Sequence, residues 1–426
     1  MLRQHPFFRL WKLTEFESPW LGFERGSVKA PIGRFFTNDL YSRFQAVLED
    51  GLKELADRDD SFRGAKIRSL AKIQEIGNLN PDAFGKILGS SGYELFSRTR
   101  HELFRKLYPR QLTVVLSYAC NLNCEFCFSS ELGKKEPGGL DRPYFEKICT
   151  WMDGKGFEFV SLFGGEPTIH PDFLYFVGEL NNRGYRVYFA TNGLYDNRVA
   201  ERLKDHDIVK ATFNIPAARD IDRKRIEKLK SNLRLFPEKA QVSFRLTLAE
   251  TNSDFELLHE LLEEFTPSSI SFALAFPADN QTNDFVKCEE ISSYVPGIMH
   301  LIELAREKGI VAALVKPVPF CRLTEEESLA LIMGTSLLNS CDIHQDGFTQ
   351  LTTLSHTGHF YPCISLAKYR SLHLDANPAL ADIGDYNRGV VEQLRQKPIL
   401  ADCADCNLYA SRICQGFCYA YYATSS

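Results

Sequence analysis

Three cysteines with short, fixed spacing carry the strongest chemical signal in this sequence. Cys120, Cys124 and Cys127 form a C-x3-C-x2-C motif directly after an apolar run, so all three fall on one short predicted loop. Thiolates are the usual protein ligands of iron–sulfur clusters, and a [4Fe–4S] cluster normally takes four of them. Three thiolates would therefore leave one iron open for a different ligand.

A second motif, Gly164-Gly165-Glu166-Pro167, follows the next predicted strand. Its glycines let the backbone come close to a ligand, because they have no Cβ. Glu166 and the exposed peptide groups could hold an ammonium group. A C-x3-C-x2-C motif alone could be a zinc site or a coincidence, but its combination with GGEP makes coincidence a poor explanation.

Together, these two motifs resemble the signature of the radical S-adenosylmethionine (SAM) enzymes. The resemblance implies that Cys120, Cys124 and Cys127 hold a [4Fe–4S] cluster whose open iron binds the amine and carboxylate of SAM. Reduction of the cluster then cleaves SAM to a 5′-deoxyadenosyl radical, which abstracts a hydrogen atom from the substrate. It also implies that Phe126 lies near the adenine and that the GGEP segment contacts SAM.

The same resemblance extends to three further strand ends. Thr191 and Asn192 begin a TNG segment like that of the family, whose polar side chains lie near the ribose or carboxylate of SAM. Asn214 ends the following predicted strand, where related enzymes often carry a serine or asparagine. Arg245 could pair with the SAM carboxylate, or it could be an outward-facing surface arginine.

Composition is ordinary for a globular protein. The chain has 426 residues, of which 44% are hydrophobic and 25% charged, with a formal net charge of −5. This charge favours neither a nucleic-acid partner nor an anionic membrane. With no evident signal peptide or membrane-spanning segment, the twelve cysteines are interpreted as metal ligands rather than disulfides, and a cytoplasmic location is expected.

The chain is expected to contain three parts. Residues 1–108 show apolar residues at helical spacing and predict a mainly helical extension, which could recognise a substrate or merely pack against the rest. Residues 109–318 alternate strands with helices, which implies parallel βαβ units and, with the resemblance, a partial (β/α)6 TIM-type barrel. Residues 319–426 are rich in cysteine. The predicted strands are Leu112–Ser117, Phe157–Phe163, Tyr185–Thr191, Ile208–Phe213, Val242–Leu246 and Ser269–Ala275.

The cysteine pattern near the C-terminus resembles a SPASM extension, which binds two auxiliary clusters, or the shorter twitch variant, which binds one. Its members are Cys341, Cys363, Cys403, Cys406, Cys414 and Cys418. The match is imperfect, because the gap between Cys406 and Cys414 is longer than usual and the final cysteine of the SPASM pattern is absent.

Family precedent assigns these cysteines in two possible ways. In the favoured assignment, one cluster uses Cys341, Cys363 and Cys418, with Cys321 as a possible fourth ligand. A second cluster then uses Cys403, Cys406 and Cys414, with a non-cysteine ligand completing it. The alternative is a single cluster on Cys341, Cys363, Cys403 and Cys406. A structural zinc ion is a third interpretation.

These features predict a radical SAM enzyme that modifies a ribosomally produced peptide by cross-linking, thioether formation, dehydrogenation or epimerisation. Cys321 is a candidate hydrogen donor for epimerisation. An oxidoreductase acting on a small metabolite is the alternative, and a zinc-stabilised binding scaffold without radical chemistry is a remote one. An electron donor such as flavodoxin or ferredoxin is an expected partner.

Overall fold

The computed structural model describes the central part of the chain and several shorter stretches beyond it. The described residues are 110–250, 254–324, 327, 331, 352–396, 400, 403–404 and 416–424. The expected helical extension at residues 1–108 lies outside these ranges, as do Cys341, Cys406 and Cys414. Within the described ranges, no helix is both long and apolar enough to cross a membrane.

The chain divides into two compact units. One unit contains residues Met1–Tyr108, Pro319–Asn339 and Leu400–Gly416, and the other contains Pro109–Val318, Ser340–Ile399 and Phe417–Ser426. The expected three-part division of the chain stays a prediction. Cys321 and Cys403 belong to the first unit, whereas the C-x3-C-x2-C and GGEP motifs belong to the second.

A nine-stranded sheet forms the centre of the second unit, with the strand order β7-β6-β5-β4-β3-β2-β1-β8-β9. Its pairings are parallel except for the antiparallel pair of β8 and β9. The strands are β1 (Arg110–Val115), β2 (Phe157–Phe163), β3 (Arg186–Thr191), β4 (Ile208–Asn214), β5 (Gln241–Leu248), β6 (Ser269–Leu274), β7 (Val311–Leu314), β8 (Thr352–Leu354) and β9 (Phe360–Tyr361).

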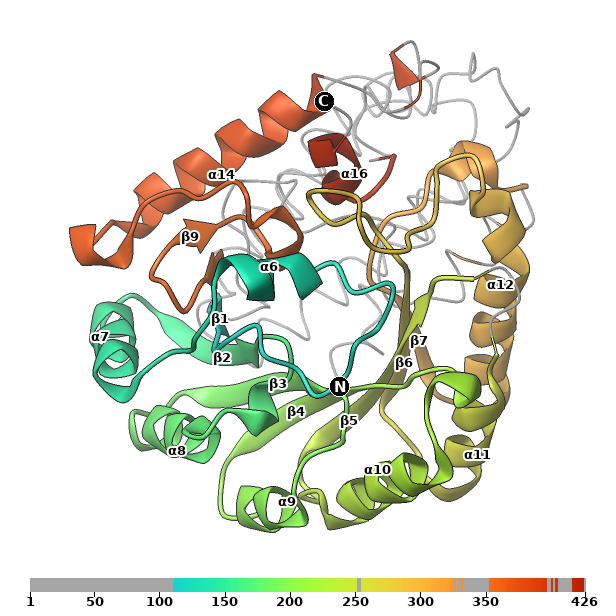
Figure 1. Ribbon diagram of the computed structural model, residues 1–426, viewed down its shortest axis with the longest axis horizontal. Helices are drawn as coiled ribbons and strands as arrows, with labels where there is room; N and C mark the ends of the chain where they lie inside the picture. Colours follow the sequence, from blue (N-terminus) through green and yellow to red (C-terminus); the bar gives the residue numbers. More distant parts are fainter. Residues whose placement is uncertain are drawn as a thin grey trace, which may run out of the picture. The chain divides into compact units, whose positions relative to one another are not determined.

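Helices connect the parallel strands and cover one face of the curved sheet (Figure 1). They are α7 (Arg142–Met152), α8 (Phe173–Asn182), α9 (Asn197–Leu203), α10 (Arg223–Leu235), α11 (Glu256–Glu264) and α12 (Ile291–Glu307). The short helix α6 (Ser130–Lys135) follows the first strand and lies inside this ring of helices. Two further helices, α14 (Leu380–Arg395) and α16 (Tyr419–Thr424), follow the β8–β9 hairpin. The predicted α/β fold with a partial TIM-type barrel is confirmed.

The structure adds strands that the six-unit prediction did not contain. The apolar stretch before Pro319 forms β7, which extends the sheet beyond β6. At the opposite end, β8 pairs with β1 in parallel and β9 returns beside it. Neither addition closes the sheet, because β7 and β9 are its two edges.

Alternation along the strands gives the sheet an apolar face and a polar face. Phe189 and Phe213 on neighbouring strands both contact Phe236 at the end of α10, so they point toward the helices. Tyr188 and Thr212 point the other way, and their hydroxyl groups lie 3.0 Å apart. The inner face therefore presents hydrogen-bonding groups.

Candidate SAM and cluster site

The loop that carries the three cysteines leaves the end of β1 and lies at the carboxyl edge of the parallel strands. Active sites of (β/α) barrels form at this edge. Cys120 is exposed, whereas Cys124 and Cys127 are half-buried. Burial, and then the neighbouring thiols of Cys127 and Cys120, raise the pKa of Cys124 to about 11. The three sulfur atoms are thus near enough to influence one another.

The two glycines of the GGEP segment hold it directly against the start of the cysteine loop. The Gly165 N–H donates to the Ser117 carbonyl at 2.9 Å, and the Glu166 N–H donates to the Ala119 carbonyl at 2.9 Å. A Cβ on Gly165 would lie 2.3 Å from the Ala119 carbonyl oxygen, and one on Gly164 would lie 2.2 Å from that of Ser117. In this structure, the glycines serve backbone-to-backbone packing.

Glu166 lies inside the protein with its carboxylate surrounded by donors of the chain itself. Only 1% of its surface is exposed. Its Oε1 accepts hydrogen bonds from the Thr168 N–H at 3.1 Å, the Thr168 hydroxyl at 2.5 Å and the Thr191 hydroxyl at 2.8 Å. Its Oε2 accepts from the Asn192 N–H at 2.6 Å. Glu166 therefore connects the turn after β2 to the end of β3.

Asn192 continues this connection to the cysteine loop. Its Nδ2 donates to the Asn121 Oδ1 at 2.7 Å and lies 3.9 Å from the Cys120 sulfur. Asn121 in turn donates to the Leu194 carbonyl at 2.9 Å. Asn121 was not among the predicted site residues, although it directly follows the first cysteine of the motif.

The far side of the cysteine loop is attached to the segment that follows β6. The Asp284 N–H donates to the Glu125 carbonyl at 3.0 Å. The Asn283 side-chain amide donates to the Phe126 carbonyl at 3.0 Å. Phe126 itself is half-buried. Since these bonds join residues far apart in the chain, the sequence alone gave no indication of Asn283.

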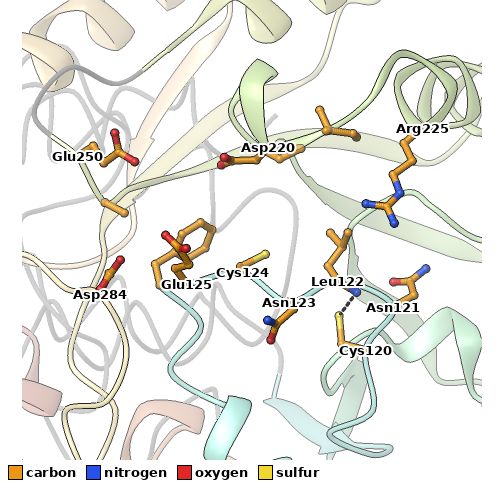
Figure 2. Close-up of a pocket in the computed structure, with 14 residues that line it drawn as sticks. Cys120, Asn121, Leu122, Asn123, Cys124, Glu125, Asp220, Arg225, Glu250 and Asp284 are labelled. Carbon is orange, nitrogen blue, oxygen red and sulfur yellow. Dashed lines mark hydrogen bonds between the residues drawn. The ribbon is translucent and has the colours of Figure 1, made fainter.

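A cavity of about 590 Å³ opens beside the cysteine loop (Figure 2). This volume is in the range of sites for small molecules and cofactors. Its walls come from the cysteine loop, the start of α10 and the segments that follow β4, β5 and β6. The lining residues are Cys120, Asn121, Leu122, Asn123, Cys124, Glu125, Phe126, Pro216, Asp220, Ile221, Arg225, Ala249, Glu250 and Asp284.

The charged groups on the cavity wall are mainly acidic. Figure 2 shows Glu125, Asp220, Glu250 and Asp284 around the position of Cys124, with Arg225 on the opposite side. Glu250 forms an ion pair with Arg219. Asp220 also lies 3.8 Å from the Arg219 Nε. The carboxylates of Glu125 and Asp284 favour a ligand with positive charge, as in the sulfonium and ammonium groups of SAM.

Asn214 and Arg245 lie side by side on the inner face of the sheet, because they are register partners on the parallel strands β4 and β5. Asn214 is exposed and Arg245 is half-buried. The Arg245 Nε donates to the Ser271 hydroxyl at 3.2 Å, which directs the guanidinium along β6 rather than toward the outer helices. Pro167, by contrast, is buried in the short turn after Glu166.

Two of the C-terminal cysteines lie close together within the second compact unit. Cys363 and Cys418 are both buried. Burial raises the pKa of Cys363, Lys316 lowers it, and the Cys418 thiol raises it. The structure therefore brings together two members of the proposed first auxiliary set, although it does not test the complete ligand assignment.

These positions can be tested against the requirements of a [4Fe–4S] cluster. Within the described ranges, no three His, Cys, Asp or Glu side chains are arranged to hold one metal ion. A cubane does not need that arrangement, because each thiolate binds a different iron. The cysteine loop offers three thiols beside a cavity of cofactor size, so the residues fit a cluster bound together with a small ligand.

Comparison with known proteins agrees with this geometry. Residues 114–279 match the model of the radical SAM superfamily, so the chain contains a radical SAM domain. Domains of this superfamily bind a [4Fe–4S] cluster and SAM. The matched residues include the cysteine loop, the GGEP and TNG segments, Asn214 and Arg245.

Two curated relatives match parts of this chain. The mycofactocin maturase MftC of Mycobacterium ulcerans is 38% identical over 111 residues, which are 26% of this chain and 30% of the relative. A cofactor-modifying protein for tungsten-containing aldehyde ferredoxin oxidoreductase from Pyrococcus furiosus is 36% identical over 88 residues, 20% of this chain and 24% of the relative. The chain thus matches less than a third of either relative's length.

The crystal structure of Streptococcus suis SuiB bound to its precursor peptide SuiA has a similar fold. The TM-score is 0.52 at 16% sequence identity, covering 90% of this chain and 90% of SuiB. This similarity confirms the architecture and leaves the activity of the present chain to be inferred from its own residues.

Proposed function

We propose that this chain is a radical SAM enzyme that modifies a ribosomally produced peptide. One observation carries the enzyme class. The cysteine loop, the turn after β2 and the end of β3 are joined by hydrogen bonds beside a cavity at the carboxyl edge of a parallel sheet. This arrangement supports a cluster bound by the three thiols together with a small cationic ligand.

Each group of residues has a defined task in this proposal. Cys120, Cys124 and Cys127 hold the cluster, which supplies the reductive cleavage of SAM when it is bound. Glu166 and Asn192 fix the loop against the sheet through buried hydrogen bonds. Asn214 and Arg245 present an amide and a guanidinium on the inner face, where they are available to the amino-acid end of SAM.

The cavity wall and the polar inner face also favour the exclusion of side reactions. A substrate that covers the open side of the cavity would separate the reacting atoms from water, which limits quenching. The cofactor supplies the difficult chemistry, while the chain provides binding and orientation. An electron donor such as flavodoxin or ferredoxin would provide the reducing electron.

Support for a peptide substrate comes from the relatives. One is a maturase, and the similar solved structure holds a precursor peptide. A small-metabolite substrate is the second candidate, and the Pyrococcus furiosus relative favours it because its name assigns it to cofactor modification. For the C-terminal region, we propose auxiliary clusters, with the proximity of Cys363 and Cys418 as support.

Metal analysis tests the enzyme class first. Iron, sulfide and zinc per chain are measured after anaerobic reconstitution, in the wild type and in the Cys120→Ala/Cys124→Ala/Cys127→Ala variant. Cubane stoichiometry predicts about 12 irons for three clusters or about 8 for two, with about 4 lost in the variant. The reconstituted wild type should also release 5′-deoxyadenosine from SAM under reducing conditions, and the variant should not. Zinc without iron would overturn the radical mechanism.

Mass spectrometry then separates the two substrate classes. The reconstituted full chain is incubated with SAM, a reductant and a short peptide encoded beside its gene. A peptide substrate should increase the release of 5′-deoxyadenosine and should leave the assay with a changed mass. If neighbouring peptides have no effect while a small metabolite is consumed, the metabolite oxidoreductase becomes the better description.

A further inference from the structure

A pair of histidines on the outer helices forms a second cluster of metal-ligating groups, separate from the cavity. His259 lies on α11 and His300 on α12, and their Nε2 atoms are 3.3 Å apart. Both side chains are exposed. Neither residue lines the cavity beside the cysteine loop. The SAM site therefore does not explain this pair.

The distance between the two nitrogen atoms is long for a direct hydrogen bond and suits one shared metal ion. Two imidazole nitrogens bound tetrahedrally to zinc at about 2.0–2.1 Å lie roughly 3.3–3.4 Å from each other. A strong N–H hydrogen bond is shorter, with a mode at about 2.9–3.0 Å. The observed 3.3 Å thus matches the edge of a zinc tetrahedron.

Packing holds the two helices and the His300 ring in this geometry. The apolar face of α11 is buried through Leu257, Leu258, Leu261 and Leu262. The His300 ring stacks on Phe255, with 4.9 Å between the ring centroids and 25° between the planes. Since the helices and one ring are held in place, little conformational entropy remains to be lost when an ion binds.

The charges around the pair favour a cation. Glu263 stands four residues after His259 on α11, and Glu303 stands three residues after His300 on α12, so each lies on the same helix face as its histidine. Glu303 is paired with Arg306, whereas Glu263 is exposed.

We propose that His259 and His300 bind one borderline transition-metal dication, such as Zn²⁺, which clamps α11 to α12. Among the described residues, no third His, Cys, Asp or Glu is already in place, so water or a rotated Glu263 completes the coordination. Imidazole nitrogen selects zinc, nickel or copper, whereas magnesium and calcium prefer oxygen ligands.

Titration of the reconstituted holoenzyme with Zn²⁺ alone tests this site, because the clusters then occupy their own cysteines. Calorimetry and the thermal unfolding midpoint are measured in the wild type, His259→Gln and His300→Gln, with iron content followed throughout. We expect one zinc equivalent in the wild type, at least tenfold weaker binding in each variant, and a zinc-dependent rise in midpoint only in the wild type.

Two controls make the result specific. His206→Gln removes a partly exposed histidine elsewhere on the barrel and should keep the zinc response of the wild type. Mg²⁺ at the same concentration should not change the midpoint. The proposal is overturned if His259→Gln and His300→Gln bind zinc as tightly as the wild type. It is also overturned if the wild type does not bind one equivalent of zinc.

Discussion

The hydroxyl groups of Tyr118 and Tyr361 lie 3.1 Å apart within the buried core of the second unit. Tyr118 stands two residues before Cys120, and Tyr361 stands two residues before Cys363. One hydrogen bond therefore joins the loop that begins the cluster motif to the hairpin that leads into Cys363, a proposed ligand of an auxiliary cluster. Burial raises the pKa of both hydroxyl groups, so both are protonated at neutral pH.

Replacement of these tyrosines should show a coupled effect on stability. Tyr118→Phe or Tyr361→Phe alone leaves one buried hydroxyl without its partner, which costs about 1–3 kcal/mol, whereas the double variant removes both groups and should cost less than the sum. Chemical denaturation of the four proteins measures this coupling. Strictly additive losses would show that the two hydroxyl groups do not interact in solution.

Gly165→Ala tests the contact between the GGEP segment and the cysteine loop. The added Cβ would lie 2.3 Å from the Ala119 carbonyl oxygen and 2.5 Å from that of Tyr118, and neither backbone group can move freely. We expect a loss of about 1–3 kcal/mol in unfolding free energy, together with reduced iron incorporation.

Gly389→Ala is the matched control for this substitution. Gly389 lies within α14, and a Cβ there would meet no atom within 4 Å. Alanine should stabilise this helix by about 1 kcal/mol and leave iron incorporation unchanged. Equal behaviour of the two alanine variants would contradict the close backbone contact.

Glu166→Gln should change the pH dependence of stability. Burial raises the pKa of Glu166 above its ordinary value of 4.5, while its hydrogen bonds partly oppose this shift. A carboxyl group with a raised folded-state pKa favours the folded state most at low pH, and this contribution declines as pH rises from 4.5 toward the folded-state value. The stability advantage of the wild type over Glu166→Gln should therefore be larger at pH 4.5 than at pH 7.5. Denaturation at both pH values measures it, and a larger advantage at pH 7.5 would contradict this sign.

Arg245→Gln tests the position of the SAM carboxylate. Loss of a charged hydrogen bond costs about 1.5–3 kcal/mol, so the dissociation constant of SAM should rise about 10- to 150-fold in the cluster-loaded enzyme. Equilibrium dialysis provides the measurement. Arg186→Gln is the control. Arg186 begins β3, so it lies at the amino-terminal end of the parallel strands, and its guanidinium stacks over Phe159. Unchanged SAM affinity in Arg245→Gln would assign the carboxylate to another group.

Local patterns in the sequence were sufficient to predict much of the fold. The strand prediction for 157–163 is confirmed at both ends, and the strand predicted at Ser269–Ala275 begins as predicted and ends one residue earlier, at Leu274. These elements have clear periodicity and buried apolar faces. The hairpin of β8 and β9 was not predicted, because such short strands show too little alternation to be recognised.

Only part of the candidate site could be predicted from local patterns in the sequence. The spacing of Cys120, Cys124 and Cys127 placed three thiols on one loop, and parallel strand order placed Asn214 and Arg245 at one edge. The functions of Gly165 and Glu166 in holding that loop were not apparent. Their partners, Ala119 and Asn192, are distant in the chain and meet them only after the strands have paired.

The sequence by itself thus determined the metal-ligating residue types, their local spacing and the alternation that builds a parallel sheet. Tertiary structure alone decided which loops meet, as shown by the contacts of Asn121 with Asn192 and of Tyr118 with Tyr361. The physical reason is the distance along the chain over which the interactions act. Periodicity and spacing arise from neighbouring residues, whereas a hydrogen bond between distant segments depends on the register and packing of every element between them.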